Sequence, residues 1–369
     1  MSKRRKRVFG IAAIGLIAAA STLTALTTAA SGSRSAKVDK PKVALITLYR
    51  EPLAQQMNAG AQLAAREYGA DYHWQGPPGL NPPQEVKMLQ DEVAAGTKGI
   101  VLMQYPPDLF NAPIKQATDQ GVAVVTIDVS APESTSGTHV GPAKTELGIA
   151  EGIALAKLIG KKKGYIQAGI CVPGLDVLVA PFVGLRKILK VLTPGVTVRK
   201  ELNVTGDPAT NFTAWQRIIS QNPRALGFVG NCDQDAPNLV KIKQQKKGKF
   251  LIADTSGDGI PVLRAVKAGT MNVVIGQAGF VSGYVGMKLV LEKLVNKKEP
   301  PKGWLDSGIE TITPANVDAA IRVRQQLAAG NLKAGYTYYR RAILRALSQK
   351  PRLETTANTQ ANLRPLVTP

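Results

Sequence analysis

The sequence predicts an α/β fold of two doubly wound, mainly parallel sheets in series. Three observations support this prediction. Short apolar runs alternate with amphipathic stretches from Lys42 onward, the alternation restarts near residue 144, and several of the apolar runs end in polar side chains. A chain of 369 residues with 44% hydrophobic content is long enough and apolar enough for two domains of ordinary size.

The first unit is expected to run βαβαβαβ. Apolar residues at three- to four-residue spacing mark its helices, and one helix begins at the pair Pro82-Pro83, which follows Asn81. The predicted strands are 42–48, 72–74, 99–104 and 122–128, and the predicted helices are 53–68, 82–93 and 109–119.

The second unit repeats the pattern. Pro181 falls inside one of its predicted helices, which makes that boundary the least regular. The predicted strands are 164–171, 196–202, 225–229, 249–254, 271–275 and 305–312, and the predicted helices are 146–159, 176–192, 212–220, 236–246, 261–267 and 281–295.

The amino terminus has the pattern of a secretory signal peptide. Basic residues 3–7 precede an apolar stretch, 8–20, and then small residues up to about Ala30, where we expect cleavage. An uncleaved anchor is the alternative, but Gly10, Gly15 and the Thr/Ser-rich end make the apolar stretch weak for a membrane span. We therefore expect a signal peptide at 1–30, a linker at 31–41, and a periplasmic or otherwise extracytoplasmic protein.

The formal charge of +21 does not by itself indicate a nucleic-acid partner. Much of it lies in residues 3–7 and after residue 318, and the basic runs 160–164 and 241–249 fall at predicted helix ends, where cations meet the helix dipole favourably. No aromatic residues are interleaved with them. We expect no nucleic-acid binding.

Catalytic signatures are also missing from the sequence. It has no GxGxxG after a strand, no P-loop and no GxSxG, its histidines His73 and His139 lie far apart, and Cys171 and Cys232 form no CxxC pair. We expect no enzyme activity, no cofactor and no metal site.

Polar side chains follow many of the predicted strands. In open parallel sheets, ligands bind beyond the carboxyl ends of the strands. Any one of these residues could be a turn former or a helix cap, but their recurrence in both units favours a cleft lined with carboxylates and amides, which suits a hydroxyl-rich ligand. The residues are Tyr49, Arg50, Glu51, Gln104, Tyr105, Asp128, Asn231, Cys232, Asp233, Asp254 and Gln277.

From about residue 41 to 317 the chain resembles the type I periplasmic binding proteins of the ribose/galactose group, the solute receptors of sugar ABC importers. The resemblance rests on the order and spacing of "EPLAQQMNAGAQLAAREYGADY", "AVVTIDVSAP", "GFVGNCDQDA", "IADTSGDG" and "AVKAGTMNVVIGQAGFVSGYVGMKLVLEKL". It implies the type I fold, in which two lobes joined by three crossovers close on ligand like a hinge, as is known for this class. The implied lobes are 42–143 with 278–304 and 144–277 with 305–318, followed by a basic C-terminal extension.

The resemblance also implies ligand-binding residues, with some departures from the family pattern. Asp128, Asn231, Asp254 and Gln277 match ligand positions of the family. The first loop has Arg50, Glu51 and Leu53 where a small amide and aromatics are usual, Val129 replaces an arginine, and neither an arginine near Pro181 nor an aromatic near Gly206 is present.

The expected ligand is therefore a sugar or polyol. Tyr49, Tyr105 and Asp233 are further candidates for contact with it, and Arg50 leaves an acidic ligand open. Tyr49, Tyr105, Trp74 and Phe182 are candidates to replace the missing stacking aromatics, with core packing as the alternative role of each.

Together these features predict a monomeric, non-catalytic receptor that delivers its solute to the membrane permease of an ABC importer. The alternatives are a receptor that presents ligand to a chemoreceptor or sensor kinase, a binder of an acidic or amino-acid-like solute and, more remotely, an enzyme. A sugar-responsive repressor would carry a DNA-binding headpiece in place of an export signal.

Cys171 and Cys232 each follow a predicted strand of the second unit. In a doubly wound order these strands are neighbours about 4.8 Å apart, which is compatible with the Cα separation of about 4.4–6.8 Å in a disulfide. A disulfide would persist in an oxidising compartment, whereas two free, buried cysteines are the alternative.

The segment 319–369 is expected to be partly helical and then disordered. Packing of its helix on the receptor body and contact with a membrane surface or partner through Arg340, Arg341 and Arg345 are the alternatives.

Overall fold

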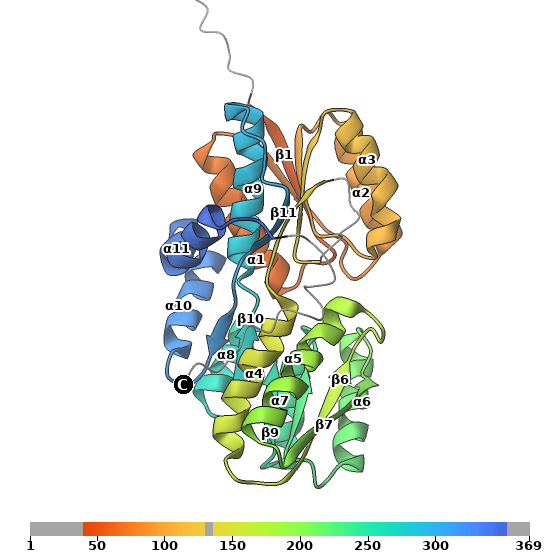
Figure 1. The fold of residues 1–369 in the computed structure, drawn as a ribbon, viewed down its shortest axis with the longest axis vertical. Coiled ribbons are helices and arrows are strands. Elements are labelled where there is room, and N and C mark those ends of the chain that lie inside the picture. Colours follow the sequence, from red (N-terminus) through yellow and green to blue (C-terminus); the bar gives the residue numbers. More distant parts are fainter. Residues whose placement is uncertain (1–39, 130–135, 353–369) are drawn as a thin grey trace, which may run out of the picture. The chain divides into compact units, whose positions relative to one another are not determined.

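The computed structural model describes residues 40–129 and 136–352, so the expected signal peptide, nearly all of the linker and the expected disordered end lie outside the described residues. Within this part, two six-stranded sheets form an α/β fold of two lobes (Figure 1). The expected fold class is confirmed. No described helix is both long and apolar enough to cross a membrane.

The first lobe is built on a parallel sheet with the strand order β11-β5-β4-β3-β1-β2. Helices α1 and α9 cover one face, and α2 and α3 cover the other (Figure 1). The strands are β1 Lys42–Ile46, β2 Asp71–Gln75, β3 Gly99–Leu102, β4 Ala123–Ile127, β5 Thr138–Gly141 and β11 Gly303–Asp306, and the helices are α1 Pro52–Glu67, α2 Pro82–Ala94, α3 Pro107–Asp119 and α9 Gly279–Asn296.

The second lobe has the strand order β12-β10-β9-β8-β6-β7, in which only β12 is antiparallel. Helices α4 and α5 pack on one face, and α6, α7 and α8 pack on the other. The strands are β6 Gly164–Ile170, β7 Val196–Asn203, β8 Gly227–Gly230, β9 Leu251–Asp254, β10 Val273–Gly276 and β12 Glu310–Ile312, and the helices are α4 Lys144–Ile159, α5 Asp176–Leu192, α6 Pro208–Gln221, α7 Asp235–Lys246 and α8 Ile260–Lys267.

The chain crosses between the lobes three times, from β5 to α4, from β10 to α9 and from β11 to β12. The expected single strand 305–312 is wrong, because the chain leaves the first sheet after Asp306 and joins the second at Glu310. Strand β5, which was not expected, pairs with β4 and β11. A stretch of only four residues, "THVG", has too little apolar pattern to be recognised from sequence.

Glycines bring helices of each lobe into close contact. A Cβ atom on Gly283 of α9 would lie 2.0 Å from the carbonyl oxygen of Met57 in α1, and one on Gly148 of α4 would lie 1.6 Å from the carbonyl oxygen of Pro181 in α5. No larger residue fits at either position. These contacts fix α1, α9, α4 and α5, and the residue before α1 and the first turn of α4 contribute to the site described below.

The C-terminal extension is part of both lobes rather than an appendage. Helix α10 (Val317–Ala328) packs on α8 of the second lobe, and α11 (Leu332–Ser348) packs on α1 and α9 of the first. Buried residues of α10 join the core of the second lobe, and Tyr339 and Ile343 of α11 join that of the first. Arg340, Arg341 and Arg345 are exposed, and Arg345 lies 3.6 Å from Asp306.

A buried polar cluster, which we call the hinge cluster, connects the extension to both lobes. It consists of Gln56, Asp258, Glu310, Arg324 and Tyr339. The Arg324 guanidinium donates from Nη2 to Asp258 Oδ2 (2.6 Å) and Glu310 Oε2 (2.7 Å). Gln56 of α1 donates to Asp258 Oδ1 (2.9 Å), and the Tyr339 hydroxyl donates to Glu310 (2.8 Å). The cluster therefore spans the first lobe, the second lobe and both extension helices.

Candidate functional site: a polar cavity at the strand ends

A cavity of about 580 Å³ lies where the carboxyl ends of strands from both sheets meet. The first lobe contributes residues that follow β1, β3 and β4, and the second contributes residues that follow β6, β8, β9 and β10. The polar and aromatic lining residues are Tyr49, Glu51, Tyr105, Asp128, Lys144, Asp207, Asn231, Asp233, Gln234, Thr255, Ser256 and Gln277. Leu48, Met103, Val129, Leu147, Val172, Leu175 and Leu178 supply much of the apolar wall.

Lys144 is the central cation of this site. Its Nζ donates to Asp128 Oδ1 (2.7 Å) and to Gln277 Oε1, and the side chains of Lys144 and Asp128 are 8% and 5% exposed. Lys144 is the first residue of α4, where the helix dipole disfavours a positive charge. Pairing with Asp128 therefore offsets both this unfavourable dipole interaction and the cost of burying the lysine charge. Asp128 follows β4, and Lys144 and Gln277 stand at the first two crossovers.

The backbone at Asp128 and at Ala278 is in the left-handed region. Asp128 has φ 62°, and Ala278, which follows Gln277, has φ 49°. Asp tolerates this conformation, whereas for Ala it costs about 1 kcal/mol or more. The surrounding structure therefore holds Asp128 and Gln277 in a fixed orientation toward Lys144.

A second polar group is formed by Tyr49, Glu51 and Asp233. The Tyr49 hydroxyl bonds to Asp233, and burial, followed by the charge of Asp233, raises the pKa of Tyr49 well above its usual value. Burial also raises the pKa of Glu51, and raises that of Asp233 to about 7 with further contributions from Glu51, Asp258 and Asp128. Ser256 Oγ donates to Asp233 Oδ1 (3.1 Å) and opposes this shift.

Asp235 does not line the cavity but organises the loop that does. It is fully buried and accepts from Trp215 Nε1 (2.7 Å) and from Asn211 Nδ2 (2.8 Å) through Oδ1. Its Oδ2 accepts the backbone N–H groups of Asn231 and Cys232, both at 3.1 Å. The loop after β8 is thus fixed from behind, and Asn231 bonds through Nδ2 to the Leu178 carbonyl of α5.

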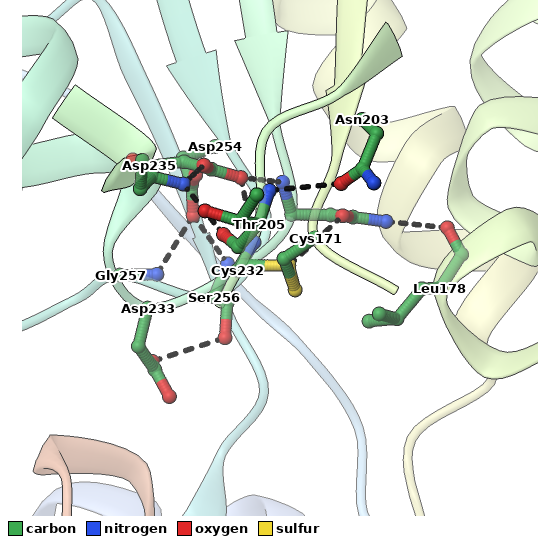
Figure 2. Close-up of a disulfide and its surroundings, with 12 residues drawn as sticks. Cys171, Leu178, Asn203, Thr205, Cys232, Asp233, Asp235, Asp254, Ser256 and Gly257 are labelled. Carbon is green, nitrogen blue, oxygen red and sulfur yellow. Dashed lines mark hydrogen bonds between the residues drawn. A yellow bond between two sulfur atoms is a disulfide. The ribbon is translucent and has the colours of Figure 1, made fainter. Parts of the chain in front are cut away.

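Asp254, one of the four residues carried over from the family pattern, lies behind the cavity wall. It is fully buried, and its Oδ1 accepts the backbone N–H groups of Ser256 and Gly257, both at 2.7 Å (Figure 2). Burial, followed by the charge of Asp235, raises its pKa well above the usual value. Its contacts shape the turn that presents Thr255 and Ser256 to the cavity.

Cys171 and Cys232 form a disulfide with a Cα–Cα distance of 6.3 Å (Figure 2). It connects the ends of β6 and β8, which are paired neighbours in the second sheet as the sequence predicted. Both cysteines line the cavity. The bridge therefore ties the loop after β6 to the loop that carries Asn231 and Asp233.

The remaining candidates divide between the cavity and the body of the protein. Tyr49, Glu51 and Tyr105 line the cavity, but Arg50 is exposed and does not. Its Nε donates to the Gly76 carbonyl (2.8 Å), and its guanidinium lies 5.4 Å from the Trp74 ring. Of the aromatics proposed to replace the missing stacking residues, Trp74 and Phe182 do not line the cavity, and Phe182 lies in the core of the second lobe.

Sequence reasoning missed Lys144, Thr255 and Ser256. A lysine in the first turn of a helix that follows a strand runs against the dipole preference, and this signal was available in the sequence. Chemically, the described residues offer hydrogen-bond acceptors, amides and two tyrosine rings. Within 40–129 and 136–352, no group of three or more His, Cys, Asp or Glu residues is placed to hold a metal ion.

Solved structures with the same fold include solute-binding proteins. A solute-binding protein of an ABC transporter from Burkholderia graminis, in complex with D-arabinose, has a TM-score of 0.69 and 22% identity over 75% of this chain and 96% of its own. One from Actinobacillus succinogenes with bound D-allose has a TM-score of 0.68 and 23% identity over 76% and 99%. One from Agrobacterium vitis with α-D-tagatopyranose has a TM-score of 0.67 and 23% identity over 75% and 96%. A comparison with curated proteins gave no match.

The sequence itself matches the periplasmic binding protein domain over residues 45–298, which is more than half of the chain. The match excludes β11 and β12 and the first residues of β1, and it includes all the other strands of the two sheets. The chain therefore belongs to the periplasmic binding protein domain family.

Proposed function

We propose that this protein is an extracytoplasmic receptor that binds a small hydroxyl-rich solute, a sugar or polyol, without catalysis and delivers it to an ABC importer. The observation that carries the proposal is the cavity at the strand ends of both lobes, with Asp128, Lys144 and Gln277 joined across two crossovers. Solute-binding proteins of ABC transporters with bound sugars share the fold.

The cavity chemistry supports a solute with several hydroxyl groups. Carboxylates accept hydroxyl protons, amide and hydroxyl side chains both donate and accept, and tyrosine rings offer apolar faces. The volume of about 580 Å³ falls in the usual range for small-molecule sites, about 300–1,000 Å³. Asp128, Asn231, Gln277, Tyr49, Tyr105, Glu51 and Asp233 are the proposed contact residues, and Asp254 is proposed to support them from behind.

A thermal-shift screen tests the proposal. The mature protein is heated with sugars, polyols, sugar acids and amino acids, one at a time. Because a ligand that binds only the folded state raises the melting temperature, we expect at least one sugar or polyol to stabilise the protein. Stabilisation by an amino acid or sugar acid with none by any sugar or polyol would refute the substrate class.

A further inference from the structure

The ionisable residues that line the cavity are unbalanced in charge. Among the lining residues that the structure describes, four carboxylates, Glu51, Asp128, Asp207 and Asp233, face one cation, Lys144. Lys144 pairs with Asp128. Asp207 is exposed at the start of α6, where it accepts the backbone N–H of Thr210 (2.9 Å) as a helix cap. Asp233 accepts a hydrogen bond from Ser256, but neither it nor Glu51 is paired with a cation among the described residues.

Neither of these two carboxylates forms an ion pair with any residue that the structure describes. Glu51 Oε2 is buried and has no hydrogen-bond partner there. The nearest cation in sequence, Arg50, bonds to the Gly76 carbonyl and does not line the cavity. Charged groups near Asp233 that affect its titration, Glu51, Asp258 and Asp128, are all acidic.

Two amide side chains that line the cavity already form hydrogen bonds with other groups of the protein. Gln277 accepts from Lys144 and donates to the Thr255 carbonyl (3.3 Å), and Asn231 donates to the Leu178 carbonyl. What remains open toward the cavity is mainly negative. A neutral solute would leave Glu51 and Asp233 without a cation, whereas a cationic solute would stabilise the ionised form of both carboxylates.

The cation that these carboxylates would bind is either a metal ion or an organic ammonium group. A metal ion needs several converging ligands, and no group of three or more His, Cys, Asp or Glu residues is so placed within the described residues. An organic ammonium group needs only two or three acceptors, and the tyrosine rings of Tyr49 and Tyr105 at the cavity wall also favour it.

We propose that the solute carries a protonated amine beside its hydroxyl groups, as in amino sugars and amino polyols, and that Glu51 and Asp233 bind the ammonium group. This inference rests on the proposed function and narrows its substrate class. Lys144 and Asp128 then neutralise each other and contact the uncharged part of the solute.

Matched pairs of compounds test the inference by calorimetry at pH 6. The pairs are D-glucosamine with D-glucose, D-galactosamine with D-galactose, and 1-amino-1-deoxysorbitol with sorbitol. We expect the amine of at least one pair to bind about tenfold or more tightly than its neutral partner, since a charge-assisted hydrogen bond contributes about 1.5–3 kcal/mol. The N-acetylated amino sugars, which lack the charge, should bind like the neutral sugars.

The outcomes separate the two proposals. If neutral sugars bind and no amine binds more tightly than its partner, the ammonium inference is overturned and the receptor function stands. If none of the compounds binds and the broader screen finds no sugar or polyol, both are overturned.

Two isosteric variants locate the amine. Glu51→Gln and Asp233→Asn should each weaken binding of the amine about tenfold more than they weaken binding of its neutral partner. Asp91→Asn is the control, because it removes one carboxylate from an exposed pair with Lys87 on α2, away from the cavity. Equal loss for amine and neutral compounds in both cavity variants would overturn the assignment, and unchanged melting temperatures exclude misfolding.

Proton release is an independent measurement. Because Asp233 has a pKa raised to about 7, it is mostly protonated at pH 6 in the free protein, and a bound ammonium favours its ionised form. Titrations in buffers of different ionisation enthalpy should therefore show release of close to one proton per amine bound. Asp233→Asn should abolish the release, and absence of release from the unsubstituted protein would contradict a role for Asp233.

Discussion

Replacement of Arg324 by Met is expected to cost much of the stability of the folded protein. The Arg324 side chain is 5% exposed and pairs with Asp258 (1%) and Glu310 (11%). Its removal leaves two buried carboxylates without their cation. Breaking a buried pair in this way costs about 3–5 kcal/mol, which is a large part of the roughly 5–15 kcal/mol that stabilises an ordinary domain.

An exposed ion pair between α8 and α10 provides a control. Lys267 of α8 and Asp318 of α10 form an ion pair of nearly the same length, 2.7 Å, but their side chains are 60% and 58% exposed. Solvent screens such a pair, so Lys267→Met should cost about 0–1 kcal/mol. Each variant removes one positive charge, whereas burial and the number of carboxylate partners differ.

Urea unfolding followed by tryptophan fluorescence measures both variants with the disulfide intact. A combined replacement, Arg324→Met with Asp258→Asn and Glu310→Gln, should recover at least half of the loss, because the amides leave no buried charge without its cation. If Arg324→Met costs no more than Lys267→Met, the argument from burial is wrong.

Three further predictions concern other parts of the molecule. Burial raises the pKa of Glu85 to about 9, so above about pH 4.5 folding requires uptake of a proton and the free energy of unfolding falls as the pH rises to 9. Glu85→Gln should therefore raise the melting temperature more at pH 8 than at pH 5. An equal gain at both pH values would contradict this. Cys171→Ser should cost about 4 kcal/mol in urea unfolding, as expected for a sequence separation of 61; two alkylated thiols in the native, non-reduced protein would exclude the bridge. Asp128→Ala should weaken solute binding by about 1–3 kcal/mol in calorimetry, and unchanged affinity would remove Asp128 from the site.

The alternation of strands and helices could be predicted because most elements are long and periodic. The two failures have a common physical origin. Strand β5 has four residues and β12 has three, so each is held by pairing with its neighbours rather than by a pattern of its own. The chain passes from the first sheet to the second between Asp306 and Glu310. In the sequence this region has the pattern of one strand, and only the tertiary structure shows that it forms two strands in different lobes.

The site was predictable in its position but not in its detail. Polar residues at strand ends indicate a ligand edge, and Asp128, Asn231 and Gln277 do line the cavity. Which of the other strand-end residues line the cavity depends on the direction of their side chains, and this direction cannot be read from the sequence. Arg50 turns to the Gly76 carbonyl, and Asp254 turns into its own loop to accept two backbone N–H groups. Lys144, which no expectation included, occupies the centre.

The position of β11 and β12 bears on how the protein can be shortened for study. Both strands lie after residue 298, where the match to the family ends, and each is the outermost strand of its sheet. A chain cut at that boundary would keep β5 and β10 but leave each with a row of unpaired backbone N–H and C=O groups. Such edges are templates for pairing between molecules. Shortened versions that end at the family boundary should therefore self-associate through both sheets. Versions that end near residue 352 keep β5 paired with β11 and β10 paired with β12.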